Sequence, residues 1–359
     1  LPWRDIVVAS GATDRVLPVP GWTLPGAYTL GAAQVALKSQ GCAVGARVVF
    51  AGSGPLLYLV AYQYAKAGAQ VAAVLDSASM GAQAAALPAM LAQPAVLAKG
   101  LYYLAWLQAH GVAVHRNAQL LRVEGGDHVN AAVWRAASGS HAPEQRLECD
   151  AVCMGHALRS ETQLADLLGC RFAYQPLQRA YLPERDSAGR TSVPGVYVAG
   201  DGAGIMGADA AEWAGERAAL ALLADHGVAV DQNRARLLEA RLQRVAGFRR
   251  ALERAFPFPD GWAAQADDAL VVCRCENVTA GDLRRAVRET GADEINRLKA
   301  LTRVGMGRCQ GRMCGVAATE ILAHAANLPL PDAGRLRAQA PIKPIPVCLH
   351  VASAPGDAP

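Results

Sequence analysis

The chain has 359 residues, of which 52% are hydrophobic and 18% are charged, and its formal net charge is +4. This length predicts two or three domains, and the apolar content is ample for large cores. The small, dispersed charge gives no support to a nucleic-acid-binding protein, because such proteins concentrate basic residues on one face.

The sequence shows no transmembrane or targeting signal. It has no run of about 18 or more purely apolar residues, which a membrane-spanning helix needs. It has no visible signal peptide, so we expect a cytoplasmic location in which free thiols persist. Leu1 stands where an initiator Met would stand, and we expect the true beginning of the protein to be missing.

The first elements predict an α/β fold. Residues 6–13 form a short apolar run that turns at Gly11, which is typical of a buried parallel strand that delivers a loop to a ligand. Residues 47–57 predict a strand, a glycine-rich turn and the start of a helix, and residues 70–75 predict the next strand. This second group has the layout of a Rossmann βαβ unit.

The Rossmann unit contains a candidate dinucleotide site. Gly52 would make the tight turn, Gly54 would let the backbone approach a pyrophosphate, and Asp76 would bind a ribose hydroxyl. The fingerprint is incomplete, because Leu57 takes the third glycine position and Pro55 interrupts it. We favour dinucleotide binding, and an empty Rossmann-like domain is the alternative. The carboxylate at position 76 disfavours NADP, because a 2′-phosphate would meet it.

The middle of the chain predicts helices over residues 81–113 and an antiparallel meander over residues 120–149. Cys149 and Cys153 fall on one predicted strand, about 13 Å apart along it, so they cannot form a disulfide. This spacing argues against a thioredoxin-reductase-like activity. Residues 226–262 predict a basic helical connector whose arginines form a solvated face, and the alternative is a docking face for a partner subunit.

A second glycine-rich turn follows an apolar strand within residues 191–204. The strand ends at Gly200 and Asp201, and an Ala-rich helix over residues 208–223 comes next. The N-terminus of such a helix favours an anionic ligand.

Four of the nine cysteines form two tight pairs late in the chain. The candidate metal ligands are Cys273, Cys275, Cys309 and Cys314. Thiolates are the soft ligands of zinc and of iron–sulfur clusters. Glycines and arginines crowd the second pair, which suits close backbone N–H groups and positive charge around a negative cluster. We favour a cluster, and a zinc site is the alternative, although Cys-x-Cys is tighter than the usual spacing in structural zinc sites.

The segments 272–276 and 302–315 make the chain recognisable. They resemble the 2Fe–2S domain related to bacterioferritin-associated ferredoxin, in the form that is fused to FAD/NAD(P)-binding oxidoreductase subunits. That family includes the flavoprotein subunits of opine oxidase, hydrogen cyanide synthase and D-hydroxyproline or proline dehydrogenase. The resemblance extends over most of the chain, and the cysteine motif is its most specific part.

The resemblance implies FAD and a 2Fe–2S cluster as cofactors, and it allows NAD or another adenine nucleotide at the Rossmann motif. It places Gly11 and Ala12 next to FAD, with Ser10 standing where the family's motif has Thr. It also implies that the Asp201 carboxylate, after Gly200, binds the ribitol hydroxyls of the flavin.

We therefore expect an α/β fold with two Rossmann-like domains, the FAD domain being split by an inserted NAD(P)-type domain, and a small helical 2Fe–2S domain. The expected segments are 1–43 (partial first segment of the FAD domain), 44–147 (NAD(P)-type domain), 148–225 (FAD return segment), 226–265 (helical connector), 266–326 (cluster domain) and 327–359 (extended Pro-rich tail). The first FAD strand, with its own glycine fingerprint, would lie outside this chain.

Together these features predict an electron-transferring subunit with FAD and a 2Fe–2S cluster. The resemblance implies a multi-subunit dehydrogenase or oxidase that acts on the C–N bond of an amine, an opine or a proline-like imino acid. Its partners would be a second flavoprotein subunit, which oxidises the substrate, and a small ferredoxin-like subunit. No residue offers a substrate acid, base or nucleophile. The alternatives are a self-contained NADH-dependent reductase and a zinc- or cluster-stabilised interaction module without enzyme activity.

Overall fold

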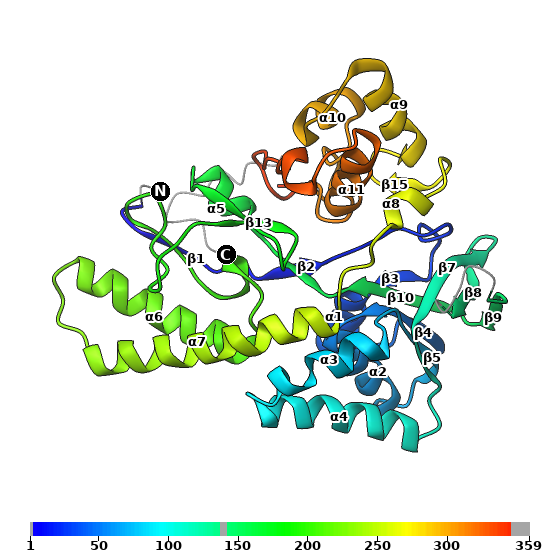
Figure 1. The fold of residues 1–359 in the computed structure, drawn as a ribbon, viewed down its shortest axis with the longest axis horizontal. Coiled ribbons are helices and arrows are strands. Elements are labelled where there is room, and N and C mark those ends of the chain that lie inside the picture. The colour runs from blue at the N-terminus through cyan, green and yellow to red at the C-terminus, as the bar shows by residue number, and fades with distance from the viewer. Residues whose placement is uncertain (1–2, 137–141, 346–359) are drawn as a thin grey trace, which may run out of the picture.

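The structure is a computed structural model that describes residues 3–136 and 142–345. Its centre is a five-stranded parallel sheet in the order β3-β10-β4-β5-β6 (Figure 1). The strands are β3 (Ala27–Thr29), β4 (Arg47–Ser53), β5 (Gln70–Asp76), β6 (Val114–Arg116) and β10 (Ala151–His156). The helices of this part are α1 (Leu30–Gln40), α2 (Pro55–Lys66), α3 (Met80–Met90) and α4 (Pro94–Ala109).

The sheet is buried on both faces, because its central strands are continuous apolar runs. On one face, residues such as Val48 and Phe50 pack with Tyr64 of α2 and Leu107 of α4. The other face packs against an antiparallel meander. Its strands are β7 (Ala118–Gly125), β8 (Val129–Ala136) and β9 (Gln145–Glu148). The predicted meander is confirmed.

The sheet extends beyond the expected domain limits of 44 and 147. β3, together with α1, precedes residue 44, and β10 follows residue 147, yet both strands pair in this sheet. The reason is that the apolar strand β10 inserts between β3 and β4. Cys149 lies in the short connection between β9 and β10 and not on β10, and Cys149 and Cys153 are both free thiols.

The part expected to bind FAD consists of short paired strands. β1 (Ile6–Val8) runs parallel to β14 (Val196–Val198), and β2 (Ala12–Asp14) pairs with β11 (Leu158–Ser160). The other elements here are α5 (Gln163–Leu167), β12 (Phe172–Gln175), β13 (Ala180–Pro183), the 3-10 turn η1 (Gly200–Ala203), α6 (Ala208–Asp225) and α7 (Gln232–Ala255).

The basic connector is the long helix α7, which packs against α3 and α6 (Figure 1). Two of its arginines contact α6, so the arginines do not form the purely solvated face that the sequence predicts. Arg234 pairs with Glu216 at 2.6 Å, and Arg241 lies 5.4 Å from the ring centre of Trp213.

The last domain is a separate helical unit that sits above the sheet in Figure 1. Its elements are β15 (Val271–Cys273), β16 (Val278–Thr279), α9 (Ala280–Thr290), α10 (Ile295–Thr302), α11 (Gly315–Ala325) and η2 (Leu330–Ala333), preceded by the short helix α8 (Trp262–Gln265). A capping box between Thr279 and Asp282 starts α9, and Gly291 in the left-handed conformation ends it.

Two tryptophans join this domain to the loop before β3. Trp22 donates from Nε1 to the Val271 carbonyl at 2.6 Å, and Trp262 donates to the Pro18 carbonyl at 3.0 Å. One apolar core runs from the sheet through Trp22 into the helices of the last domain. The domain is therefore fixed against the sheet by burial as well as by hydrogen bonds.

The tail is pinned as far as residue 345. Asp166 of α5 accepts hydrogen bonds from Arg335, Arg337 and the Ala338 N–H. Although burial opposes it, these partners hold the pKa of Asp166 below its ordinary value. The rest of the predicted Pro-rich tail lies outside the described residues. Within the described part of the chain, no helix has both the length and the apolar character to span a membrane.

Gly52 gives a test of how tightly the sheet is packed. Its φ is +137°, and a Cβ at this position would collide with the Gly155 carbonyl of β10. We expect Gly52→Ala to lower the free energy of unfolding by on the order of 3 kcal/mol, measured by guanidinium titration. Gly100→Ala on α4 is the matched control, because nothing lies near its added Cβ, and it should leave stability equal or slightly raised. Equal effects of both substitutions would contradict this packing.

Candidate functional site

The four cysteines of the two pairs come together at one end of the last domain. Cys273 ends β15, Cys275 lies in the following turn, and Cys309 and Cys314 bracket the loop before α11. The Cys314 thiol contacts those of Cys273 and Cys309, and the Cys309 thiol also contacts that of Cys275. All four are free thiols, and Cys275 is the exposed one of the four.

Hydrogen bonds at this site favour the thiolate form at two of the four cysteines, whereas the pKa values of Cys275 and Cys314 are raised. A hydrogen bond from the Cys314 thiol, supported by the N–H groups of Gly305, Glu276 and Cys275, lowers the pKa of Cys273 to about 6. A hydrogen bond from Cys314, with N–H groups of the loop, also lowers the pKa of Cys309. The thiolate is the form that binds a metal. The first turn of α11 adds its positive dipole end, because Cys314 is the N-cap of that helix.

A short segment that begins at the last residue of β11 links the cysteine loop to the predicted FAD loop. We call residues 160–163 the bridging segment. The Glu161 N–H donates to the Gly11 carbonyl at 2.9 Å, and the Ser10 hydroxyl donates to the Glu161 carbonyl. On the other side, Arg312 Nε donates to Glu161 Oε2 at 2.6 Å. Gln163 adds a 2.6 Å hydrogen bond from its Nε2 to the Gln310 carbonyl.

The bridging segment therefore contacts Gly11 on one side and the loop of Cys309 and Cys314 on the other. The cysteine motif includes Arg312, but the sequence gives no sign of Glu161, because it lies 151 positions earlier and outside any recognisable motif. The sequence also gives no sign of Arg159, which is close enough to Cys309 and Cys314 for its charge to act on them.

The predicted flavin residues meet at the carboxyl ends of β1 and β14. Because these strands are parallel, the turns at Gly11 and Gly200 emerge at the same edge. A Cβ on Gly202 would lie 2.6 Å from the Ser10 hydroxyl, so the two turns are in contact. Asp201 Oδ1 accepts from the N–H groups of Met206 and Gly207 at 2.9 and 3.2 Å, which shapes the entry to α6.

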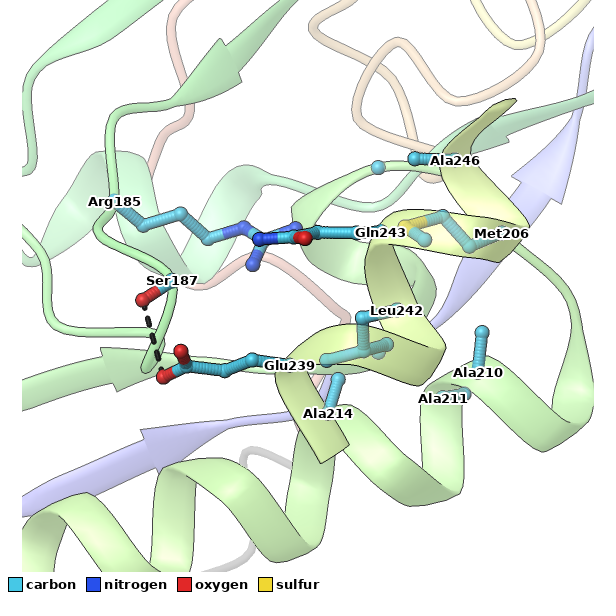
Figure 2. A pocket seen from close by; sticks show the side chains of 12 residues that line it. Arg185, Ser187, Met206, Ala210, Ala211, Ala214, Glu239, Leu242, Gln243 and Ala246 are labelled. Carbon is cyan, nitrogen blue, oxygen red and sulfur yellow. Dashed lines mark hydrogen bonds between the residues drawn. The ribbon is translucent and has the colours of Figure 1, made fainter. Parts of the chain in front are cut away.

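A cavity of ≈ 190 Å³ opens beside this turn, between α6 and α7 (Figure 2). Gly200, Gly204 and Met206 line one wall, and Glu239, Leu242 and Gln243 of α7 line the other. Pockets that enclose a whole ligand have volumes of roughly 300–1,000 Å³. This cavity can therefore hold only part of a flavin cofactor.

Other features of this region also fit a bound ligand. Gly11 and Gly207 have φ of +72° and +99°, and nothing lies within 4 Å of a Cβ on either, which leaves the backbone accessible. The buried polar atoms Thr13 Oγ1, Ser160 Oγ and Gln163 Oε1 have no hydrogen-bond partner among the described residues. Thr13 follows Ala12 on β2, Ser160 pairs with Ala12 from β11, and Gln163 lies in the bridging segment. Unpartnered buried polar groups are costly, so a ligand that satisfies them is favoured.

The Rossmann motif gives a different result. Asp76 is fully buried and accepts from Tyr58 at 2.5 Å, from Gln83 at 3.0 Å and from the Ala78 N–H at 2.9 Å. Burial raises the pKa of Asp76. In this structure three donors of the chain itself occupy the carboxylate, which disfavours the predicted ribose contact. Gly52 lets β4 lie close to β10, because it has no Cβ to collide with the Gly155 carbonyl. Gly54 precedes α2 as its N-cap.

Comparison with known proteins identifies the class. Residues 1–215 match the family described as pyridine nucleotide-disulphide oxidoreductase, and residues 271–324 match the BFD-like [2Fe-2S] binding domain. The chain belongs to this family of FAD-dependent oxidoreductases, in the form that carries a C-terminal [2Fe-2S] domain. Its cofactors are FAD and a [2Fe-2S] cluster, and the expected fold class is confirmed.

The similar proteins are more particular. The chain is 38% identical to a subunit of opine oxidase from Agrobacterium tumefaciens (strain Ach5), over 95% of this chain and 68% of that protein. It is 34% identical to hydrogen cyanide synthase subunit HcnB of Pseudomonas protegens, over 96% of this chain and 74% of the relative. The fold matches L-proline dehydrogenase from P. horikoshii with a TM-score of 0.67 at 19% identity, over 96% of this chain but 57% of that one.

These matches favour the cluster over the zinc alternative, because the domain that holds the four thiols is a [2Fe-2S] domain. Among residues 3–136 and 142–345, no group of three or more His, Cys, Asp or Glu side chains is arranged to hold a metal ion as it stands. A cluster with two irons spreads four thiolates over a larger volume than a single ion does.

The ion pair of the bridging segment is testable. The side chains of Arg312 and Glu161 are only 15% and 9% exposed, so Arg312→Met leaves a carboxylate unpaired in a mostly buried place. We expect the cluster domain to lose about 3 kcal/mol of stability. Guanidinium titration followed by the visible absorbance of the cluster measures this loss.

Two further variants sharpen that test. Arg303→Met removes a cation that is 66% exposed and paired with Glu276, so it should change stability little. Adding Glu161→Gln to Arg312→Met should restore most of the loss, because the unpaired charge is then gone. A double variant that is as unstable as Arg312→Met alone would contradict the ion-pair explanation.

Proposed function

We propose that the chain is the electron-transferring FAD/[2Fe-2S] subunit of a multi-subunit dehydrogenase or oxidase. The bond oxidised is the C–N bond of an amine, an opine or a proline-like imino acid. The observation that carries this proposal is the bridging segment, which contacts Gly11 on one side and the loop of Cys309 and Cys314 on the other. The names of the similar proteins, two of which are called subunits, support the substrate class.

In this proposal each group of residues has one task. The four thiols of Cys273, Cys275, Cys309 and Cys314 hold the cluster. Gly11, Ala12, Gly200 and Asp201 hold part of FAD. When bound, FAD supplies two-electron chemistry and the cluster supplies one-electron chemistry. The bridging segment holds the two sites at a fixed separation, and the core around Trp22 keeps water out of the docked face of the cluster domain.

Substrate oxidation is assigned to a second flavoprotein subunit, with a small ferredoxin-like subunit being a further partner. The cavity at Gly200 is lined by one carboxylate, Glu239, and one hydroxyl, Ser187, and both are engaged, because Ser187 and Arg217 donate hydrogen bonds to Glu239. An NADH-dependent reductase is not favoured, because Asp76 is fully engaged inside the protein.

Anaerobic purification with the natural partner chains, followed by a visible spectrum and analysis of iron and sulfide, tests this proposal. We expect flavin bands with about two iron and two sulfide per chain. Cys275→Ser should lose most of the iron and keep the flavin. Cys42→Ser, an exposed cysteine outside the site, should keep both.

Two outcomes would overturn the proposal. A colourless protein that contains one zinc per chain would leave a structural module. Rapid bleaching of the flavin by NADH alone would make the chain a self-contained reductase.

A further inference from the structure

We propose that the surface beside Cys275 is the docking site of an acidic electron-carrier protein, and that single electrons cross between carrier and cluster at this thiolate. The proposal rests on the relay function above. The site is a hollow of ≈ 490 Å³ at the turn between β15 and β16. Its lining residues are Thr23, Val271, Arg274, Cys275, Asn277 and Arg308.

The four cysteines differ in solvent exposure, and the most exposed one lies in this hollow. Cys273 and Cys314 are each 1% exposed, and Cys309 is half-buried. Cys275 is exposed and forms part of the hollow. Electron transfer weakens steeply with distance, so a carrier reacts fastest where a ligand of the cluster reaches the surface. Among the four thiols, that position is Cys275.

The arginines around the cluster also distinguish this edge, because some of them are paired with carboxylates and others are not. Arg303 pairs with Glu276, and Arg312 pairs with Glu161, so these two cations are neutralised. Arg274 and Arg308 form no ion pair with any residue in the described ranges, and both are exposed in the hollow. The unneutralised positive charge of this motif is therefore concentrated around the exposed thiol.

The rim is also ordered before any partner arrives. The Arg274 guanidinium lies 5.5 Å from the ring centre of Trp22, and Trp22 is itself buried and bonded to the Val271 carbonyl. A cation over an aromatic face is held in place without losing its charge. Asn277 adopts a φ of +53°, which closes the turn around the Cys275 side of the hollow.

These features fit one kind of partner. Complementary charge steers a negatively charged protein to the hollow, and a small, polar, charge-dominated contact suits the brief encounters of electron carriers. A second copy of this chain would present the same arginines and would be repelled. In each encounter one electron passes from the singly reduced cluster to the oxidised carrier, so the cluster is reoxidised and the carrier is reduced, with no proton or bond transferred.

A plant-type [2Fe-2S] ferredoxin, which is small and acidic, serves as the probe. Calorimetry measures its Kd for the holoprotein, and stopped-flow absorbance measures the rate at which dithionite-reduced ferredoxin reduces the cluster. We expect Arg274→Glu/Arg308→Glu to weaken binding and slow the second-order rate by at least tenfold. For the wild type, both the affinity for ferredoxin and the second-order rate should fall as the salt concentration rises. The same variant should accelerate electron transfer to ferricytochrome c, a basic carrier.

Arg288→Glu/Arg297→Glu is the matched control, because it makes the same change in net charge at exposed positions on α9 and α10 of the same domain. It should stay within twofold of the wild type in both measurements. Equal losses in the two double variants, or no loss in the first, would overturn the docking site. Iron and sulfide are measured in every sample. A wild-type protein without a cluster would count against the relay function. The Kd for ferredoxin does not require electron transfer, so it tests the docking surface separately.

Discussion

The buried ion pair between Arg312 and Glu161 is the interaction on which the arrangement of this protein depends. Two charges that are taken out of water need each other, so the pair is satisfied in one relative position of the two domains. Glu161 also donates its backbone N–H to Gly11 and accepts the Ser10 hydroxyl at its carbonyl. A single residue therefore connects the cysteine loop to the turn at Gly11, which is predicted to bind the flavin.

The docking of the cluster domain makes that position rigid. Trp22 and Trp262 each donate a hydrogen bond across the junction, and the apolar core continues through it. The tail from η2 onward adds a further tie through Asp166. As a result, one side of the cluster site faces the region predicted to bind the flavin, and the other, at Cys275, faces solvent. An electron relay needs two such faces, one on which the cluster receives electrons and one on which it passes them on.

What the sequence could predict was local. The cysteine spacing, the strand and turn before Asp201 and the capping box at Thr279 are all set by residues within one turn or loop, so their patterns were sufficient. Glu161 and Arg159 could not be found in this way, because their partners lie about 150 residues further along the chain. Only the packing of the domains brings them together.

Asp76 shows that a correctly predicted local fold does not determine which groups a side chain contacts. An acid at the end of the second Rossmann strand predicts a ribose contact, and the strand, turn and helix are where the sequence puts them. The pattern carries no information about Tyr58, one turn into α2, whose hydroxyl reaches the carboxylate first. Likewise β10 joins the sheet through pairing with strands more than 100 positions earlier, which a reading in chain order assigns to the next domain.

The central claim is that the cluster loop and the flavin turn form one mechanical unit. Amide hydrogen exchange, compared between the holoprotein and protein from which the iron has been removed anaerobically by a chelator, tests this directly. We predict faster exchange not only within residues 271–324 but also at the Glu161 amide and in residues 10–14, because the anchored loop releases the bridging segment. Faster exchange that stops at the borders of the cluster domain would contradict the claim and leave two domains that merely touch.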